Sequence, residues 1–220
     1  MQVIYATKSM LNADALEDEL ENKRIANMEA NSNATGRELN FHHASFLAYI
    51  DAAYNPIVSQ DNASFGVFLR DESRNHSIFI QVVARDVCSV LQAEALGLLL
   101  AAESVKYLNW SPVYFLSDCR ILVKAVKAKD LIRNPGHWNL RPTLADFFNL
   151  VSGLACYRIE HIPRINNLMA HNLVKKAYFS KSPSSYSFLC GKGARCNYKM
   201  ALEAISFPRG NLIFVHCLGC

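Results

Sequence analysis

The sequence lacks long hydrophobic runs, and no stretch reaches the roughly 18 consecutive apolar residues that a membrane-spanning helix needs. It is poor in charge, since charged residues make up 19% of the chain against 51% hydrophobic residues, and it has no internal repeat. The first twenty residues include acidic side chains where a signal peptide needs a longer apolar block and a cleavage site. These absences exclude a disordered, repetitive or membrane-spanning chain. We expect a soluble, intracellular protein of the nucleus or cytoplasm with no membrane partner.

A disulfide framework is also absent from the pattern. The seven cysteines, at positions 88, 119, 156, 190, 196, 217 and 220, are odd in number and scattered, which favours reduced thiols. Near the C-terminus, Cys190, Cys196, His216, Cys217 and Cys220 form a weak candidate for Zn²⁺. Their spacing is loose, so an irregular segment without a metal is the simpler interpretation.

Three zones divide the 220 residues. Residues 1–44 form an acidic appendage with a helix over residues 10–30, residues 45–180 form one compact domain, and residues 181–220 form an irregular tail that contains cysteines. The net charge of +4 combines −3 over residues 1–40, +3 over 41–180 and +4 over 181–220. This mild basicity permits a nucleic-acid partner without requiring one. The sequence specifies no particular protein partner.

The middle zone alternates between strand-type and helix-type patterns. The patterns predict strands over residues 45–54, 64–71, 76–85, 112–117 and 156–162, and helices over residues 90–108, 119–131, 138–153 and 166–179. Ser89 and Gln92 form a capping box at the start of the first of these helices. The order β-β-β-α-β-α-α-β-α predicts an α/β domain that begins with an antiparallel meander.

Three acids occupy positions where an unpaired carboxylate is costly. Asp51 interrupts an apolar strand, Glu94 lies on the core side of a long apolar helix, and Asp118 ends the fourth strand, at an edge where open α/β sheets bind ligands. Each has a plainer explanation: Asp51 facing water, Glu94 paired with a buried arginine, Asp118 capping the next helix. Taken together, they suit Mg²⁺, which prefers carboxylate and water oxygens. Two such ions, about 4 Å apart, cleave phosphodiesters in many nucleases.

Four segments match one family in order and spacing. They are "DAAY…SFGVFLRD", "LQAEALGLLLAAESV", "FLSDCRILVKAV" and "HIPRINNLMAHNLVKKA". Over residues 45–180 this ordered set resembles the ribonuclease H-like domains of plants that descend from the ribonuclease H part of retrotransposon reverse transcriptases. The resemblance implies a ribonuclease H-like fold, a five-stranded mixed sheet flanked by helices. It also implies endonucleolytic hydrolysis of RNA in RNA–DNA hybrids with two Mg²⁺ ions held by an Asp-Glu-Asp-Asp set.

The resemblance assigns these roles residue by residue. Asp51, Glu94 and Asp118 match the first three metal-binding acids, and His161 matches a histidine that assists product release in some members. The family pattern His-Val-Pro-Arg-Glu-x-Asn-x-x-Ala-Asp departs twice here, because Ile165 replaces an acid and His171 replaces the fourth metal-binding aspartate.

His171 therefore decides the interpretation of the site. Ala170, Leu173, Val174 and Ala177 form the predicted core stripe of the last helix, and Asn167, His171 and Lys175 lie on the neighbouring polar face. A neutral imidazole can bind a metal, but it brings no negative charge and favours Mn²⁺ or Zn²⁺ over Mg²⁺. His171 is either a working catalytic and metal-binding substitute or a solvated relic of a decayed site.

Basic residues after the fourth strand offer a nucleic-acid surface. Arg120, Lys124 and Lys127 share one face of the second helix, with Lys129 and Arg133 beyond it, and Asn167, His137 and Trp138 are further candidate contacts. A solvated helix face explains the same pattern.

Three hypotheses remain open. The chain is an impaired metal-dependent ribonuclease H using Mg²⁺ or Mn²⁺, a non-catalytic module that binds an RNA–DNA hybrid or another duplex, or an interaction or relic protein.

Overall fold

The computed structural model describes residues 45–55, 63–129, 140–179, 187–203, 205 and 210–219. The chain divides into two units, Met1–His42 and His43–Cys220, and all described residues lie in the second unit. The predicted helix over residues 10–30 lies outside the described residues, as do Arg133, His137, Trp138 and Cys220.

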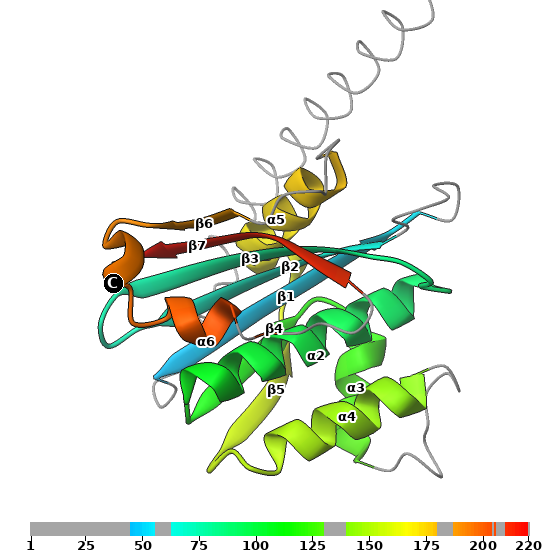
Figure 1. Cartoon of the computed structure of the whole chain (residues 1–220). Coiled ribbons are helices and arrows are strands. Elements are labelled where there is room, and N and C mark those ends of the chain that lie inside the picture. Colours follow the sequence, from blue (N-terminus) through cyan, green and yellow to red (C-terminus); the bar gives the residue numbers. More distant parts are fainter. Residues whose placement is uncertain are drawn as a thin grey trace, which may run out of the picture. The chain divides into compact units, whose positions relative to one another are not determined.

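A mixed sheet forms the centre of the domain (Figure 1). The first five strands are β1 Phe46–Tyr54, β2 Ala63–Asp71, β3 His76–Ala84, β4 Val113–Ser117 and β5 Tyr157–His161. As predicted, β1, β2 and β3 pair antiparallel in sequence order, while β4 pairs parallel with both β1 and β5. The carboxyl ends of β1, β4 and β5 therefore lie along one edge of the sheet.

Helices cover both faces of this sheet (Figure 1). They are α2 Val90–Leu108, α3 Arg120–Ala128, α4 Arg141–Val151 and α5 Leu168–Phe179, with a short 3₁₀ helix η2, Arg164–Asn167, before α5. Figure 1 shows α2, α3 and α4 on one side of the sheet and α5 on the other. None of the described helices combines the length and apolar character required to cross a bilayer. The predicted α/β class with a helix-flanked mixed sheet is confirmed.

Helix α2 runs through the middle of the core. Ser89 Oγ accepts the backbone N–H of Gln92 at 3.1 Å, as the predicted capping box requires. Gln92 Oε1 accepts the N–H of Cys88, at 2.7 Å, rather than that of Ser89, so the reciprocal half of the box is shifted by one residue. Most of α2 is buried, because it packs against β1, β2, α4 and α6 rather than along a single stripe. This packing explains how Glu94 comes to be buried.

Two more strands extend the sheet beyond the five predicted. They are β6 Ser187–Cys190 and β7 Gly210–Leu218, separated by α6 Lys199–Glu203, and the strand order is β5-β4-β1-β2-β3-β7-β6. β7 pairs antiparallel with β3, and β6 pairs parallel with β7. The prediction of an irregular tail is therefore wrong for this part of the chain. The free edge of β3, which local sequence does not reveal, supplies the hydrogen-bond partners for β7.

The described part of the candidate zinc set does not assemble. His216 and Cys217 are adjacent on β7, so their side chains point to opposite faces of the sheet. Among the described residues, Cys190, Cys196, His216 and Cys217 belong to no group close enough to hold a metal.

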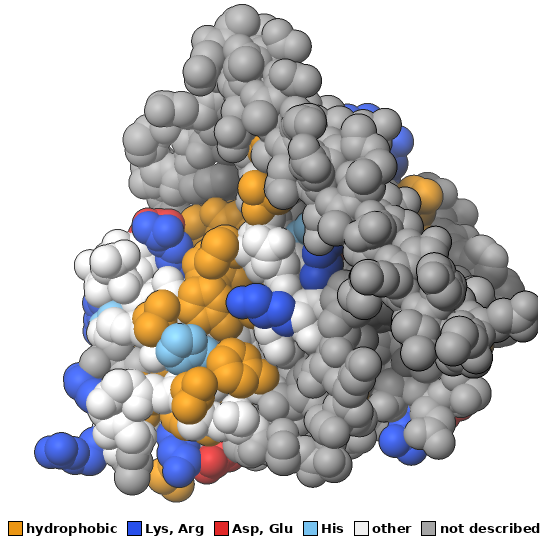
Figure 2. Space-filling view, turned by 90° about the horizontal axis from the view of Figure 1, so that it is seen from above, with side chains coloured by type: hydrophobic (Ala, Val, Ile, Leu, Met, Phe, Trp, Pro, Cys, Tyr) orange, Lys and Arg blue, Asp and Glu red, His pale blue; other side chains and the backbone are white. Residues whose placement is uncertain are grey.

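An aromatic row crosses the sheet on the face that α5 partly covers. Tyr49, Phe68, Phe79 and His216 are successive cross-strand partners on β1, β2, β3 and β7. Their ring centroids are 5.5, 5.0 and 5.8 Å apart in that order. Figure 2, which views the molecule from above, shows hydrophobic side chains and a histidine gathered on this face, with basic side chains around them.

Candidate metal centre

Three acids from three elements meet at the carboxyl edge of the sheet. The parallel register of β1 and β4 places Ile50 opposite Ser117, so Asp51 and Asp118 follow side by side. Glu94, on the second turn of α2, approaches the same point. One carboxylate oxygen from each of the three lies within 4.8 Å of the others, the only such metal-compatible group among the described residues. The predicted convergence is observed.

The three carboxylates repel one another in a poorly solvated place. The side chains of Asp51 and Glu94 are buried, at 2% and 6% relative exposure, and Asp118 is half-buried. Burial raises the pKa of Glu94 well above its usual value, the charges of Asp51 and Asp118 raise it further, and Arg164 opposes them. Oε2 of Glu94 is buried and has no hydrogen-bond partner among the described residues. A bound cation would reduce the repulsion between the carboxylates and would give Oε2 of Glu94 a partner.

The plainer explanations of the three acids do not fit the contacts. Helix α3 begins at Arg120 with Cys119 as its N-cap, and no side chain caps it, so Asp118 is not a helix cap. Instead, Ser117 Oγ accepts the backbone N–H of Cys119 at 3.0 Å. The burial of Asp51 excludes a water-facing role, and no ion pair joins Glu94 to an arginine within the described residues.

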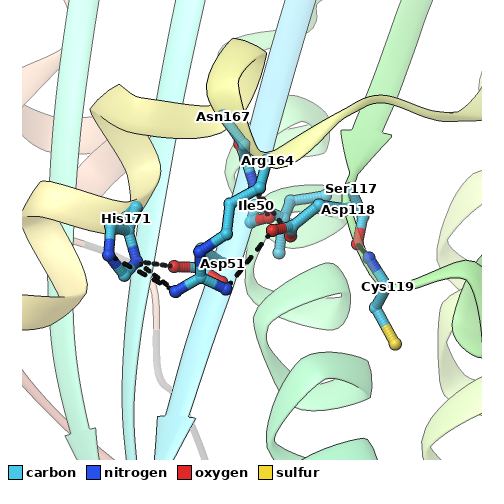
Figure 3. A network of polar contacts seen from close by, with 8 residues as sticks. All are labelled: Ile50, Asp51, Ser117, Asp118, Cys119, Arg164, Asn167 and His171. Atoms are coloured by element: carbon cyan, nitrogen blue, oxygen red, sulfur yellow. Dashed lines mark hydrogen bonds and ion pairs between the residues drawn. The ribbon is translucent and has the colours of Figure 1, made fainter. Parts of the chain in front are cut away.

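Asn167 fixes the geometry around Asp118 (Figure 3). Its Nδ2 donates to the backbone oxygen of Ile50 at 2.8 Å and to Oδ1 of Asp118 at 3.1 Å. The Asn167 side chain is fully buried, so the prediction that it contacts nucleic acid is wrong. It links η2 to β1 and to Asp118, which makes it a positioning residue. Its Oδ1 is also buried and, among the described atoms, has no hydrogen-bond partner.

His171 points into the site, as predicted from its helix face. Its Nδ1 lies 2.8 Å from Oδ2 of Asp51, and its side chain is only 15% exposed. His171 is therefore not a freely solvated side chain, because its half-buried imidazole contacts a metal-ligand candidate, whereas its interpretation as a relic stays a prediction. Figure 3 shows its ring directed at Asp51 from α5.

Arg164 lies between His171 and Asp118 and was not predicted as a site residue. Its Nη1 is 3.6 Å from Oδ2 of Asp118, and its Nη2 is 3.0 Å from Nδ1 and 3.3 Å from Nε2 of His171. The lone-pair directions of the two imidazole nitrogens diverge in the plane of the ring. Since Nη2 of Arg164 is nearly equidistant from both nitrogens, it cannot lie along either direction. The guanidinium therefore contacts the imidazole as a whole (Figure 3). The sequence feature that could have identified Arg164 is its position three residues before Asn167.

His161 lies at the same sheet edge but outside the cluster. It ends β5 as the register partner of Ser117, so it is close in the sheet to Asp118. Within the described part of the chain, its side chain forms no hydrogen bond or ion pair, and it does not belong to the acidic group. Its predicted role in product release stays a prediction.

The predicted phosphate track on α3 is exposed and partly neutralised. Arg120, Lys124 and Lys127 are all exposed. Lys127 Nζ pairs with Oε2 of Glu160 on β5 at 2.5 Å, and Lys129 lies 5.8 Å from the ring centre of Tyr157. Arg120 and Lys124 remain the better candidates for contacts with phosphate.

A cavity of about 330 Å³ adjoins the cluster. Its lining combines strand residues of β1 with the polar face of α5 and includes Asp51, Tyr54, Asn55, Arg164, His171 and Lys175. Asp51, although buried, thus forms part of the wall of a cavity that a ligand could enter, and Arg164, His171 and Lys175 line the same cavity.

The comparisons with known proteins agree with this architecture. Residues 50–177, more than half of the chain, match the reverse transcriptase-like family. No curated protein matches the sequence. The chain is similar to the ribonuclease H1 of the halophilic archaeon Halobacterium salinarum NRC-1, with 20% identity and a TM-score of 0.51 over 60% of this chain and 96% of that one.

It is also similar to the N-terminal ribonuclease H domain of a Mycobacterium tuberculosis protein, with 16% identity and a TM-score of 0.52 over 61% of this chain and 93% of that one. Identities this low establish likeness of fold alone. The family match covers β1 to α5, the segment that brings the three acids together. The chain belongs to the reverse transcriptase-like family, and its described domain has the ribonuclease H-like fold.

Proposed function

We propose that this domain is a metal-dependent ribonuclease H-type nuclease, which binds RNA–DNA hybrids and cleaves the RNA strand with impaired efficiency. The observation that carries the proposal is the meeting of Asp51, Glu94 and Asp118 within 4.8 Å, where a buried Glu94 oxygen finds no hydrogen-bond partner in the described part of the chain. The two solved structures that share the fold are named as ribonuclease H proteins, which supports the choice of reaction type. A retrotransposon origin stays a prediction.

The residues present fit one hard divalent cation. Asp51, Glu94 and Asp118 would hold Mg²⁺ or Mn²⁺ through carboxylate oxygens, the ligands both ions prefer. A bound ion would supply an activated water and stabilise the leaving oxygen of the phosphodiester. Asn167 keeps Asp118 in place through its bonds to Asp118 and Ile50. The fit is incomplete at His171, which contributes an imidazole in place of a carboxylate.

Impairment follows from charge. Replacement of a fourth carboxylate by His171 removes one negative charge from the side chains that hold divalent ions, so these ions bind less tightly. A less tightly held ion stabilises less of the charge that develops in the transition state. His171 Nδ1 also contacts Asp51 Oδ2, so one oxygen of that ligand already has a partner. We expect slow cleavage that responds better to Mn²⁺ than to Mg²⁺.

Nucleic-acid binding depends on a different set of side chains. Arg120 and Lys124 are exposed on α3, two and six residues beyond Asp118, and Lys175 lines the cavity beside Asp51. These cations can contact backbone phosphates on either side of the acids, and such contacts make affinity fall with salt. Lys127 contributes less, because Glu160 pairs with it.

The deciding experiment measures cleavage of a labelled RNA–DNA hybrid in Mg²⁺ and in Mn²⁺. We expect slow cleavage by the wild type, none by Asp51→Asn, and an increase of about tenfold or more for His171→Asp, which restores a carboxylate. His171→Asn is the matched control, since it changes the ring without adding charge. Wild-type protein and His171→Asp that both fail to cleave in either metal would contradict the proposal.

A non-catalytic hybrid-binding module is the second candidate. It is favoured by the contacts of His171 with Asp51 and of Arg164 with Asp118, which occupy oxygens a metal would use. This function predicts salt-sensitive hybrid binding, weakened by Arg120→Ala and Lys124→Ala, with no cleavage by any variant.

A further inference from the structure

Arg164 spans the exposed side of the acidic cluster. It follows β5 and opens η2, and its guanidinium reaches Asp118 with one nitrogen and the imidazole of His171 with another. His171 contacts Asp51 in turn, so a series of contacts runs from Asp118 through Arg164 and His171 to Asp51 (Figure 3). The guanidinium is thus held at the cluster from two sides.

The charges of these groups match one divalent ion better than two. In the family pattern, four carboxylates and the same arginine carry a balance of −3, which one divalent ion does not neutralise. Asp51, Glu94 and Asp118 carry three when ionised, and Arg164 carries one permanent positive charge, which leaves a balance of −2. The opposing influence of Arg164 on the pKa of Glu94 shows that its charge is felt at the third acid as well.

We propose that Arg164 is a built-in cation of this site: the cluster takes a single divalent ion, and Arg164, held against His171, replaces the positive charge of a second. The proposal rests on the metal-binding role of the cluster and deepens it. Oε2 of Glu94 is buried and has no hydrogen-bond partner among the described residues, so this oxygen is available as a ligand for that one ion.

An incidental surface ion pair is the competing explanation. The Arg164 side chain is 58% exposed and its nitrogen lies 3.6 Å from Asp118, and exposed pairs of this kind contribute little to stability. An incidental pair predicts no effect of Arg164 on metal binding, whereas a built-in cation must compete with metal for the same carboxylates. Metal affinity and stoichiometry therefore separate the two explanations.

The experiment titrates the full chain with Mn²⁺ at low ionic strength, without nucleic acid, and counts free Mn²⁺ by electron paramagnetic resonance. We expect one ion per chain in the wild type. Arg164→Gln should bind one ion about tenfold more tightly, because a competing charge is removed. Arg164→Lys, which keeps the charge, should stay within about twofold of the wild type.

The double variant tests the second half of the proposal. The single variant His171→Asp should gain only a weak second Mn²⁺ site, because Arg164 can pair with the new carboxylate. The double variant His171→Asp/Arg164→Gln should bind two Mn²⁺ ions, the second about tenfold more tightly than in the single variant. Arg158→Gln is the matched control, since Arg158 is exposed on β5 and lies over Tyr114, outside the site. It should bind Mn²⁺ like the wild type.

Unchanged or weaker Mn²⁺ affinity in folded Arg164→Gln would overturn the proposal, as would two ions in the wild type. Circular dichroism melting of every variant identifies loss of binding that comes from unfolding. The outcome is independent of the nuclease proposal, because a chain that never cleaves hybrid can still bind Mn²⁺ more tightly after Arg164→Gln. Cleavage without the change in affinity would support the nuclease and reject the built-in cation.

Discussion

At the scale of single residues, two acids on α2 place uncompensated carboxyl groups inside the domain. Glu94 and Glu103 each have a buried Oε2 without a hydrogen-bond partner among the described residues. Glu94 belongs to the acidic cluster. Glu103 lies elsewhere: its pKa is raised to about 7, mainly by burial and also by the charge of Asp146, while Lys106 lowers it. Glu103 therefore changes charge near neutral pH without involving the candidate site.

The raised pKa of Glu103 links folding stability to pH. An acid whose pKa is higher in the folded state than the value of 4.5 expected when unfolded favours folding in its protonated form. This contribution is fully present below pH 4.5 and is lost as the pH rises through about 7. Since the side chain is only partly buried, solvent screening reduces the effect to about 1 kcal/mol.

We predict that Glu103→Gln stabilises the protein by about 1 kcal/mol at pH 8 relative to the wild type, and that the difference disappears at pH 4.5. The neutral amide avoids the cost of a buried charge. Urea unfolding at several pH values measures the difference in the free energy of unfolding between Glu103→Gln and the wild type. Glu203→Gln, at an exposed position of α6, is the control and should show no such pH dependence. An equal difference at both pH values would exclude titration of Glu103 as the cause.

At the scale of elements, the contact of α5 with β2 sets the position of the polar residues that reach the acids. Gly66 of β2 lies under α5, and a Cβ at this position would meet the backbone oxygen of Ala170 and approach Leu173 Cβ to 2.8 Å. Only glycine permits this approach. Asn167 and His171 flank Ala170, so the distance between β2 and α5 decides whether they reach Asp118 and Asp51.

We predict that Gly66→Ala destabilises the domain by about 1–3 kcal/mol, because α5 must move away from β2. It should also weaken Mn²⁺ binding, since Asn167 moves with the helix. Gly153→Ala is the matched control: its Cβ would meet only the backbone oxygen of Leu150 at 3.8 Å. Urea unfolding and Mn²⁺ titration measure the two effects. Wild-type values for Gly66→Ala would show that α5 is not fixed by this contact.

At the scale of the whole domain, the sheet extends past the five strands that the family resemblance implies. β7 covers the edge of β3, and it places Val215 and Cys217 in the core with 0% and 1% exposure. The other face of β7 carries His216 and Leu218, and Leu218 is 47% exposed. The C-terminal segment is thus a structural part of the domain, with an alternation of buried and exposed residues that is typical of a strand.

Substitutions that introduce a charge on β7 test whether this strand packs into the core of the domain. We predict that Val215→Asp lowers the free energy of unfolding by more than about 3 kcal/mol or prevents folding, because it buries an unpaired charge. Leu218→Asp, three residues away on the opposite face, should change it by less than about 1 kcal/mol. Thermal melting of the two variants compares them directly. Equal, small effects would show that β7 does not pack as described.

The sequence alone determined the local elements and the main chemical components. The strand-type and helix-type patterns located β1 to β5 and α2 to α5 within a few residues, and the capping residues gave the start of α2, because these signals depend on neighbours in the chain. Asp51, Glu94 and Asp118 stood out because each is a carboxylate in an apolar pattern. The family resemblance arose from the three segments that contain these acids and from the segment that contains His171, in their order and spacing.

Tertiary structure alone decided the rest, because it depends on contacts between residues far apart in the chain. Pairing of β7 with β3 requires the free edge of a strand more than 120 residues earlier. The burial of Asn167 is set by Ile50 and Asp118, and the position of Arg164 is set by His171 and Asp118. Periodicity specifies which face of an element is apolar, whereas the partners of its polar groups are specified only once the elements have packed together.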